Sequence, residues 1–395
     1  MNHPIDQIVL KSQQYMSSNS IDGWLIYDYR YFNPVMQDTI GHIPNMTRPY
    51  WFWIPSENEP VLLSSSVDLG RFPKSDVKKL AWTSRNEMIN LLHEILKDSE
   101  TVAMEYSPRC ELPRVSKVDA GTIELVREAH VKIVSSADLF QYSTQIWTSK
   151  DLESHKIAAT LLTKIVHEAF AYIGEQINSN ITEFKVAEFI RSRFVEENMV
   201  ITDGPVVATN SHSSDPHYEP SKEDSSVIET GDWVLIDLWS RLIGDDTMSA
   251  DITWTGYVGE DIPSKNQEVF DIVIGARDLA LNFLAKAHSD GKSVPGYKMD
   301  LVARDYINKA GYGSYFKHRL GHSIGREIHS NAVNLDSFET YDTRKIIPGI
   351  AFSIEPGIYL PEFGIRSEID VFLSELGPQP TTEIQTAPII IKSNS

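Results

Sequence analysis

The pattern of hydrophobic positions changes along the chain and predicts an α/β region followed by an α+β region. In residues 1–147, runs of aromatic and β-branched residues at 24–27, 50–54 and 101–106 predict strands. Between them, residues 87–96 repeat their apolar positions at helical spacing. This mixture is typical of an independent α/β domain, whose tryptophans we interpret as core or interface residues rather than as a cofactor site.

A domain boundary is predicted near Thr148, so that residues 148–395 form the second domain. Thr148 and Asp151 make a capping-box pattern that opens a long amphipathic helix to about residue 177. Further helices are expected to begin at Thr182 and at a cap formed by Ser264 with Gln267. Strands are expected at 232–239, 251–258, 351–359 and 365–373.

Five residues with metal-binding side chains lie in these strands or in glycine-rich segments. They are Asp237, Asp251, His322, Glu355 and Glu368. Burying four carboxylates close together is costly unless a cation compensates their charge. A pair of divalent ions supplies that compensation, so the sequence favours a two-metal hydrolase. The oxygen-rich set suits manganese, cobalt or iron(II) as well as zinc, and the single cysteine excludes a cysteine-rich site.

The same residues also have ordinary structural explanations. A strand-end aspartate such as Asp237 can cap a turn, and a lone histidine is more often a core residue than a ligand. Arg366 lies two residues before Glu368 on the same side of a strand, which allows a buried ion pair. The hairpin from 237 to 251 carries Asp245 and Asp246 at its tip, where they are expected to crowd the site.

Composition narrows the choice of partners and location. The formal charge of −19 disfavours nonspecific binding to nucleic acid or anionic lipid, which leaves small molecules or peptides. The first residues lack a basic region followed by an apolar one, and no stretch approaches 18 uncharged apolar residues. A cytoplasmic protein with no membrane partner is therefore expected.

The segments VLIDLW, SADITWTG, HRLGHSIGREIH, PGIAFSIEPGIYLP and GIRSEID resemble the five signature segments of the pita-bread metallopeptidases. This family includes methionine aminopeptidase, aminopeptidase P and prolidase. The resemblance covers about residues 148–392. It implies a creatinase-like accessory domain at 1–147 and an α+β pita-bread catalytic domain at 148–395, and the accessory domain is typical of the proline-directed members.

The resemblance also implies roles for individual residues. Asp237, Asp251, His322, Glu355 and Glu368 would bind two divalent ions, with manganese expected first and cobalt, zinc or iron(II) as alternatives. Glu355 would double as the general base, and His217 and His329 would be further catalytic residues. His318 and Arg366 would bind the substrate. The implied reaction is hydrolysis of the bond before proline, at a peptide N-terminus or in a dipeptide, by a homodimer.

Three other functions compete with this one. GHSIG at 321–325 matches the nucleophile elbow of serine hydrolases, but no acid followed by a histidine in elbow order lies downstream. A non-catalytic binding protein on the same fold typically loses metal ligands, whereas all five are present here. A metal-dependent lyase acting on a small sulfonium compound would keep them, because fold does not fix function.

Overall fold

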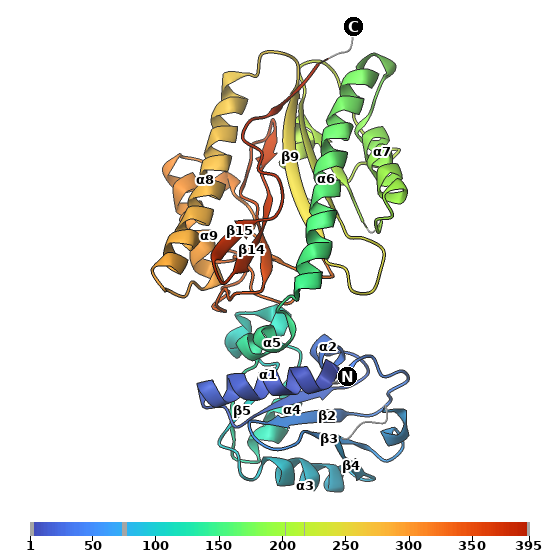
Figure 1. Ribbon diagram of the computed structural model, residues 1–395, viewed down its shortest axis with the longest axis vertical. Helices are drawn as coiled ribbons and strands as arrows, with labels where there is room; N and C mark the ends of the chain where they lie inside the picture. The colour runs from blue at the N-terminus through green and yellow to red at the C-terminus, as the bar shows by residue number, and fades with distance from the viewer. Residues whose placement is uncertain (1–3, 73–76, 202, 217, 393–395) are drawn as a thin grey trace. The chain divides into compact units, whose positions relative to one another are not determined.

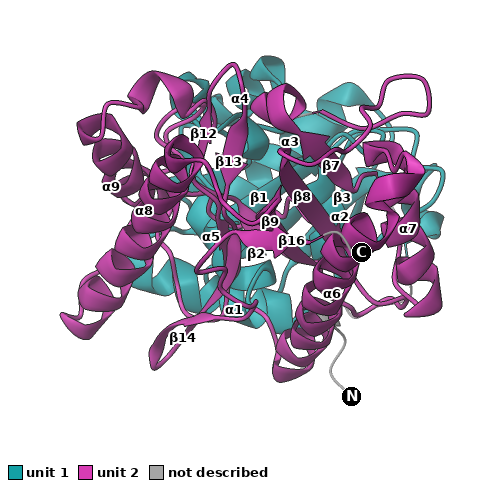
Figure 2. Ribbon diagram, turned by 90° about the horizontal axis from the view of Figure 1, so that it is seen from above, with its two compact units in different colours: residues 1–146 teal, residues 147–395 magenta. Residues whose placement is uncertain are grey.

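The computed structural model describes residues 4–72, 77–201, 203–216 and 218–392. The chain divides into two compact units, Met1–Ile146 and Trp147–Ser395, one residue away from the boundary expected from the sequence. Figure 2 colours the two units separately, and each is described by itself.

The first unit is an α/β sandwich around a six-stranded sheet of order β4-β3-β2-β1-β5-β6. Its strands are β1 (Gly23–Asp28), β2 (Tyr50–Pro55), β3 (Val61–Ser65), β4 (Lys78–Trp82), β5 (Thr101–Met104) and β6 (Lys132–Ser135). Its helices are α1 (Pro4–Asn19), α2 (Pro34–Ile40), α3 (Arg85–Leu96), α4 (Ala120–Arg127) and α5 (Ala137–Thr144). The three strands and the helix expected from the sequence are present, each within two residues at its ends.

Both faces of this sheet are buried, because alternate residues of a strand point to opposite sides. Trp24 and Ile26 of β1 pack in a core with α1, α2 and α5, whereas Leu25 packs on the other face in a core with α3 and α4. Trp24, Trp51 and Trp53 are at most 4% exposed. These three tryptophans are core residues, in agreement with the prediction of core or interface positions, and Trp82 is partly buried against the same core.

A buried carboxylate joins three elements of the first unit. Glu105 is 1% exposed and accepts hydrogen bonds from Trp24 Nε1 at 2.7 Å, Asn33 Nδ2 at 2.8 Å and Ser136 Oγ at 2.9 Å. Burial raises the pKa of Glu105 to about 7, although these donors oppose the shift. The carboxyl group is thus held in a place that favours its neutral form.

The second unit contains two helix pairs and two larger sheets. Its helices are α6 (Ser149–Gln176), α7 (Glu183–Glu196), α8 (Ser264–Ser289) and α9 (Gly296–Lys309). Its strands are β7 (Val206–Thr209), β8 (Trp233–Ser240), β9 (Ala250–Val258), β10 (Ser323–Ile324), β11 (Ala351–Ile354), β12 (Gly357–Tyr359), β13 (Gly364–Arg366), β14 (Ile369–Ser374), β15 (Gly377–Pro380) and β16 (Ile389–Ile391). The sheets have the orders β16-β9-β8-β7 and β10-β11-β14-β15, with β12 and β13 forming a separate ribbon.

Each helix pair covers one part of this β structure. Within the second unit, Figure 1 shows α6 and α7 on one side of β9, and α8 and α9 on the other side, beside β14 and β15. One core joins α6 and α7 to β7, β8, β9 and β16, and a second joins α8 and α9 to β11 through β14. The strands between the helix pairs are therefore shielded from water. This α+β arrangement follows the α/β unit, as the sequence predicted.

Helix starts test the capping predictions directly. Thr148 caps α6 in a complete capping box with Asp151, and Thr182 caps α7 by accepting the Lys185 N–H. The predicted cap at Ser264 is wrong, because α8 already includes Ser264 and its N-cap is Pro263. Pro263 has no side-chain donor or acceptor, and α8 begins without a side-chain cap hydrogen bond.

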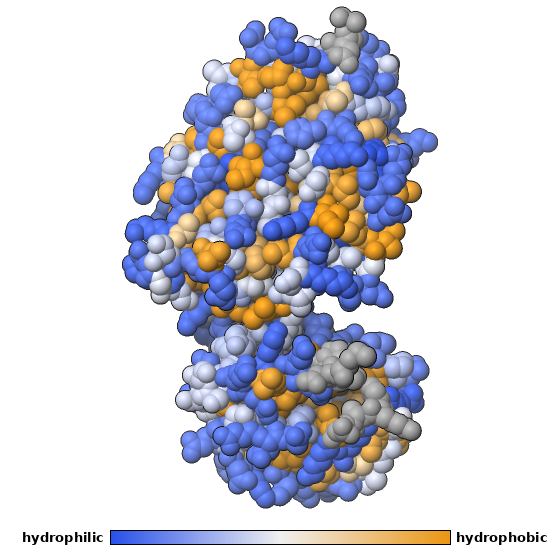
Figure 3. All heavy atoms as spheres, in the orientation of Figure 1, coloured by the Kyte–Doolittle hydropathy of each residue, from blue (hydrophilic) through white to orange (hydrophobic). Residues whose placement is uncertain are grey.

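The surface composition and the longest helix can be compared with the expectation that the protein binds neither nucleic acid nor membranes. On the face drawn in Figure 3, hydrophilic side chains surround scattered hydrophobic ones, as the net charge of −19 leads one to expect. By length and composition alone, Ser149–Ser179 could cross a membrane, but 50% of its most apolar window is buried inside the structure. That burial is typical of the core helix of a globular unit.

Replacing Glu105 with glutamine is expected to flatten the dependence of folding stability on pH between pH 5 and pH 8. The folded-state pKa lies above the unfolded value, so the folded state binds more protons between these values and loses stability as pH rises through about 7. The difference corresponds to on the order of 3 kcal/mol. Chemical unfolding of both proteins from pH 5 to pH 8 measures it, and parallel pH profiles would contradict the assignment.

Candidate metal centre

Two aspartates lie on one face of the β8–β9 hairpin. Asp237 follows the buried apolar run of β8 and lies opposite Thr253 of β9, while Asp251 precedes Thr253 by two residues. Residues two apart on a strand face the same side, so both carboxylates point toward one face of the sheet. Asp237 is 9% exposed and Asp251 is 5% exposed.

The two glutamates lie at breaks between strands, which corrects the expected continuous strands 351–359 and 365–373. Glu355 lies between β11 and β12, and Glu368 lies between β13 and β14.

At these breaks, the backbone N–H groups of the two glutamates donate hydrogen bonds to segments other than the neighbouring strand. The Glu355 N–H donates to Leu320 O at 2.8 Å, and the Glu368 N–H donates to Thr253 O at 3.2 Å. Pro356, directly after Glu355, has no N–H to continue a ladder. The strands end there because their backbone groups pair with other segments, and this brings both side chains to the aspartates.

His322 completes the cluster from the segment before β10. Its Nε2 lies 3.4 Å from Glu355 Oε1 and 3.6 Å from Asp251 Oδ2. Asp251, His322 and Glu368 each offer a ligand atom within 4.8 Å of the others, and all three are buried. The five candidate ligands, which are spread over 132 residues (237 to 368), therefore converge on one place.

Arg366 and Thr253 connect the carboxylates. Arg366 Nη2 donates to Asp237 Oδ2, and Arg366 Nε donates to Thr253 Oγ1 at 2.9 Å. Thr253 Oγ1 in turn donates to Glu368 Oε2 at 2.7 Å. Arg366 therefore forms its ion pair with Asp237 and not with Glu368, which was the alternative considered from the sequence. Arg366 is linked to Glu368 through the Thr253 hydroxyl group.

Burial dominates the electrostatics of the carboxylates. It raises the pKa of Asp237, Asp251 and Glu368, and the neighbouring negative charges raise those of Asp251 and Glu368 further. Burial also raises the pKa of Glu355 to about 7, against the opposing charge of Arg366. A site that disfavours ionisation of its own carboxylates is one that a cation would stabilise strongly.

The donor set fits a divalent metal. Three oxygens, Asp237 Oδ1, Asp251 Oδ1 and Glu368 Oε1, are buried and have no hydrogen-bond partner in the part of the chain that the structure describes. Buried polar atoms normally have partners. Oxygen ligands with one imidazole are typical of manganese, iron, cobalt and zinc sites, so these side chains could hold such ions.

The neutral form of His318 follows from its contacts. Its Nδ1 lies 2.7 Å from Arg319 O, which can only accept, so Nδ1 carries the proton. Its Nε2 then accepts from the Tyr359 hydroxyl at 2.7 Å, and Arg366 Nη1 donates to the same hydroxyl at 3.1 Å. Burial, and then the charge of Arg366, lower the pKa of His318 to about 3.

The remaining predicted site residues have different positions. His329 is exposed, and its ring packs edge-on against His322 with centroids 4.4 Å apart. His217 lies outside the described residues. Asp245 and Asp246 do not crowd the site, because their side chains are 100% and 73% exposed and pair with Arg326 and Lys150.

The nucleophile-elbow alternative does not fit the structure. Ser323 is fully buried in the two-residue strand β10, and irregular backbone rather than a helix follows it through residue 331. An elbow serine must be exposed at a turn between a strand and a helix. GHSIG serves here to carry His322 on a closely packed backbone.

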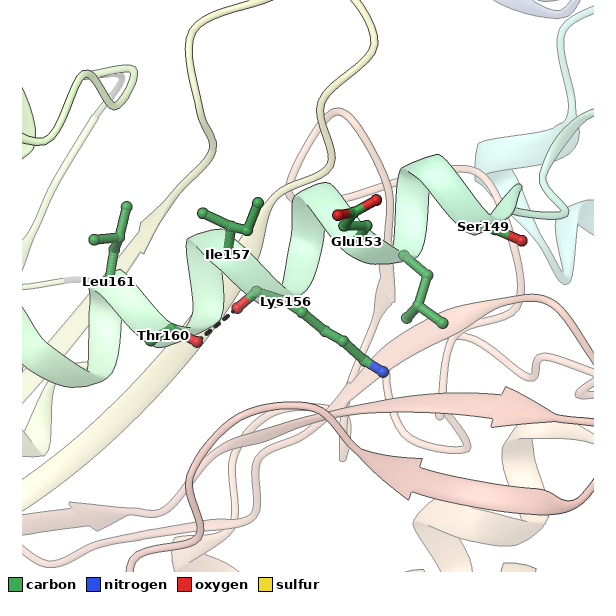
Figure 4. A pocket seen from close by; sticks show the side chains of 7 residues that line it. Ser149, Glu153, Lys156, Ile157, Thr160 and Leu161 are labelled. Carbon is green, nitrogen blue, oxygen red and sulfur yellow. Dashed lines mark hydrogen bonds between the residues drawn. The ribbon is translucent and has the colours of Figure 1, made fainter.

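A surface hollow over the start of α6 is separate from this chemistry. Its lining residues all come from one helix: Ser149, Leu152, Glu153, Lys156, Ile157, Thr160 and Leu161. Figure 4 shows these side chains along one stretch of α6, with Thr160 Oγ1 bonded to its own helix at Lys156 O. None of the candidate ligands lines it.

Sequence reasoning missed three residues of the site. Thr253 could have been found from its spacing of two from Asp251, and Tyr359 from its place in the EPGIY segment. Asp370 Oδ2 accepts the Asp251 N–H at 2.8 Å and so fixes the backbone of a candidate ligand. No local signal indicates that contact, which joins strands 119 residues apart.

Comparison with known proteins agrees with this geometry. The model of metallopeptidase family M24 matches residues 157–375. Xaa-Pro dipeptidase of Pyrococcus furiosus is 29% identical over 297 residues, which cover 74% of this chain and 77% of that protein. Dipeptidase PepE from Mycobacterium ulcerans has a similar fold, with a TM-score of 0.74 and 20% identity over 98% of both chains. The prolidase from Pyrococcus horikoshii has a TM-score of 0.62 and 25% identity, over 96% of this chain and 98% of that one.

Thr253→Val is expected to lower the affinity for divalent metal by roughly 10- to 100-fold, because it removes the hydroxyl that orients Glu368 and binds Arg366. Calorimetric titration of the metal-depleted protein with Mn²⁺ measures this.

Thr255→Val is the matched control, since Thr255 is equally buried on the same face of β9 and its hydroxyl has no partner among the described residues. Equal losses in both variants would mean that Thr253 acts only through packing.

Proposed function

The chain belongs to metallopeptidase family M24, and from this premise we propose that it hydrolyses the peptide bond that precedes proline, with divalent metal bound by Asp237, Asp251, His322, Glu355 and Glu368. The observation that carries the proposal is the convergence of these side chains with three buried carboxylate oxygens left without partners among the described residues. Substrates are peptides with proline in the second position or Xaa-Pro dipeptides.

Charge favours two ions over one. The four ionised carboxylates and Arg366 sum to −3, so one divalent ion leaves −1 and two leave +1. A small positive excess suits a site in which negative charge develops on the scissile carbonyl oxygen. Manganese is the first candidate because it accepts oxygen-rich sites with one imidazole, and cobalt, iron(II) and zinc remain compatible.

Divalent ions held by these side chains would supply Lewis-acid polarisation of the scissile carbonyl. Glu355 takes the proton of the attacking water, a role that suits a carboxyl group at the edge of the cluster with 14% of its side chain exposed. Its Oε1 also accepts from Ser353 Oγ at 3.2 Å, which fixes the orientation of the carboxylate. Arg366, held by Asp237, keeps the Tyr359 hydroxyl turned toward His318.

Two arguments support proline specificity: the names of the relatives, and the missing N–H of the Xaa-Pro peptide bond. The relatives from Pyrococcus furiosus and Pyrococcus horikoshii are named Xaa-Pro dipeptidases. An Xaa-Pro bond has no N–H for a protease to bind, so recognition must come from ring shape and from side-chain donors. The half-buried His318 forms an aromatic and polar wall with the buried Tyr359 and Arg366 that suits this task, and His217 and His329 are proposed to act beside it.

The competing functions have less support. A binding protein without catalysis has no need of five converging ligands, and the relatives are named peptidases. A lyase acting on a sulfonium substrate would show no turnover of peptides, so the peptide assay separates the two. A cytoplasmic location, a homodimeric state and the absence of nucleic-acid and membrane partners remain predictions of the sequence.

Glu355→Gln is expected to lower kcat by about 100-fold or more, since it removes the general base and one anionic ligand.

Excess chelator should abolish activity of the wild-type protein, and Mn²⁺ or Co²⁺ should restore it better than Mg²⁺, which loses its water reluctantly. Release of product from Xaa-Pro peptides measures both effects.

Ser323→Ala serves as the control and is expected to be nearly silent. Full wild-type activity in chelator together with loss of activity in Ser323→Ala would overturn the metallopeptidase mechanism.

The wild-type protein is expected to cleave Xaa-Pro peptides faster than matched Xaa-Ala peptides, and His318→Ala should lower kcat/KM for Xaa-Pro by roughly fivefold to tenfold, the scale of one lost hydrogen bond. Metal content should stay near that of the wild type. Arg366→Ala is a poorer probe, because it also leaves Asp237 without its partner. Equal rates for the two peptide series would remove proline from the proposal.

A further inference from the structure

The segment that delivers His318 and His322 to the site has no regular secondary structure. Residues 316–320 lie between the short 3₁₀ helix Gly313–Tyr315 and β10 and belong to neither a helix nor a strand. Backbone groups of this partly buried irregular segment need partners other than those of a continuous strand ladder. The position of His318 therefore depends on what else binds this backbone.

One ion pair on α9 binds it at three points. Asp300 and Arg304 are four residues apart on the helix; Asp300 is fully buried and the Arg304 side chain is 12% exposed. Asp300 Oδ1 accepts the Leu320 N–H at 2.8 Å, while Arg304 donates to Phe316 O at 3.0 Å and to His318 O at 2.7 Å. The pair thus holds alternate residues of the segment, including His318 itself.

Ring contacts reinforce this arrangement. The Arg304 guanidinium lies 4.2 Å from the ring centroid of Phe316 and 4.4 Å from that of Phe338. Phe316 in turn packs edge-on against the His318 ring, with centroids 5.3 Å apart and planes at 87°. Arg304 therefore constrains both the backbone of His318 and, through Phe316, its imidazole.

The same pair reaches the general base through one residue. Leu320 donates its N–H to Asp300, and its carbonyl oxygen accepts the Glu355 N–H at 2.8 Å. The break between β11 and β12 that carries Glu355 is thus tied to the backbone that Asp300 holds.

From these contacts we infer that Arg304, with Asp300, is a positioning residue for the reaction proposed above: it fixes residues 316–320 so that the His318 ring is presented to the Tyr359 hydroxyl. The inference rests on the proposed function only for its kinetic consequence. Its structural consequence concerns this chain alone and can be measured without metal or substrate.

The variant Arg304→Lys tests it, because lysine keeps the positive charge but its single ammonium group cannot reproduce the planar fork that reaches two carbonyl oxygens and Asp300. We expect kcat/KM for an Xaa-Pro peptide to fall roughly fivefold to tenfold, since small misplacement of a site residue is costly. Metal content should not change. Arg193→Lys is the matched control, since Arg193 of α7 binds Glu168, Glu196 and Glu197 and, among the described residues, no group of the candidate site.

A double-mutant cycle with His318→Ala separates positioning from general stability. If Arg304 acts through His318, adding Arg304→Lys to His318→Ala should cause little further loss. Independent, additive losses would overturn the inference.

Histidine-labelled, metal-depleted protein gives a second readout by nitrogen NMR. The His318 signal, identified by its loss in His318→Ala, should show the neutral form protonated at Nδ1, and Arg304→Lys should shift it toward a mixture of tautomers. An unchanged signal would contradict the inference. If Arg304→Lys fails to fold, Phe338→Leu replaces it in the kinetic and NMR measurements. Phe338 is 55% exposed and its ring lies over the Arg304 guanidinium, so a smaller change in the His318 signal is expected.

Failure of this inference and failure of the proposed function give different results. A wild-type protein that cleaves no Xaa-Pro peptide when loaded with metal contradicts the proposed function, while the NMR comparison still decides whether Arg304 positions His318. A wild-type protein that cleaves the peptide, combined with additive losses in the cycle, contradicts only the positioning role.

Discussion

Mutual repulsion among buried carboxylates is the constraint on which the second unit depends. Asp237 and Asp251 come from two neighbouring strands of one sheet, and Glu355 and Glu368 come from two strand breaks, yet these side chains converge on one place with His322. Removing such charges from water costs several kcal/mol each in real proteins unless they are compensated. Arg366 compensates Asp237 directly, and the remaining negative charge makes the site a strong receptor for divalent cations.

Precise placement of these ligands comes from interrupted secondary structure. Glu355 and Glu368 face each other across one interruption: β11 pairs with β14 on one side of it, up to Ile354 and Ile369, and β12 pairs with β13 on the other side, from Gly357 and Arg366. Breaking the strands frees backbone N–H groups, and the fold satisfies them with Leu320 and Thr253. The cost of irregular backbone is thus offset by contacts that also lock the geometry of the site.

Side chains behind the ligands determine which protonation states the site can use. His318 cannot donate from Nε2, because Arg319 O fixes the proton on Nδ1 and the Tyr359 hydroxyl occupies the other nitrogen. Arg366 donates to the same hydroxyl and to Asp237, so one guanidinium connects a candidate ligand to Tyr359 and His318. In the proposed function, this guanidinium couples substrate recognition to metal binding.

The sequence by itself determined the features that depend on neighbours in the chain. The capping box at Thr148 and Asp151, the strands of apolar and β-branched residues, and the ligand types in order from Asp237 to Glu368 could all be read from local pattern, because propensity and side-chain chemistry are local properties. Tertiary structure alone decided the strand breaks at Glu355 and Glu368. It also decided that Arg366 pairs with Asp237 rather than with Glu368, and that Asp300 and Arg304 bind the backbone of residues 316–320. These contacts join segments far apart in sequence, where hydrogen-bond satisfaction and burial outweigh local preference.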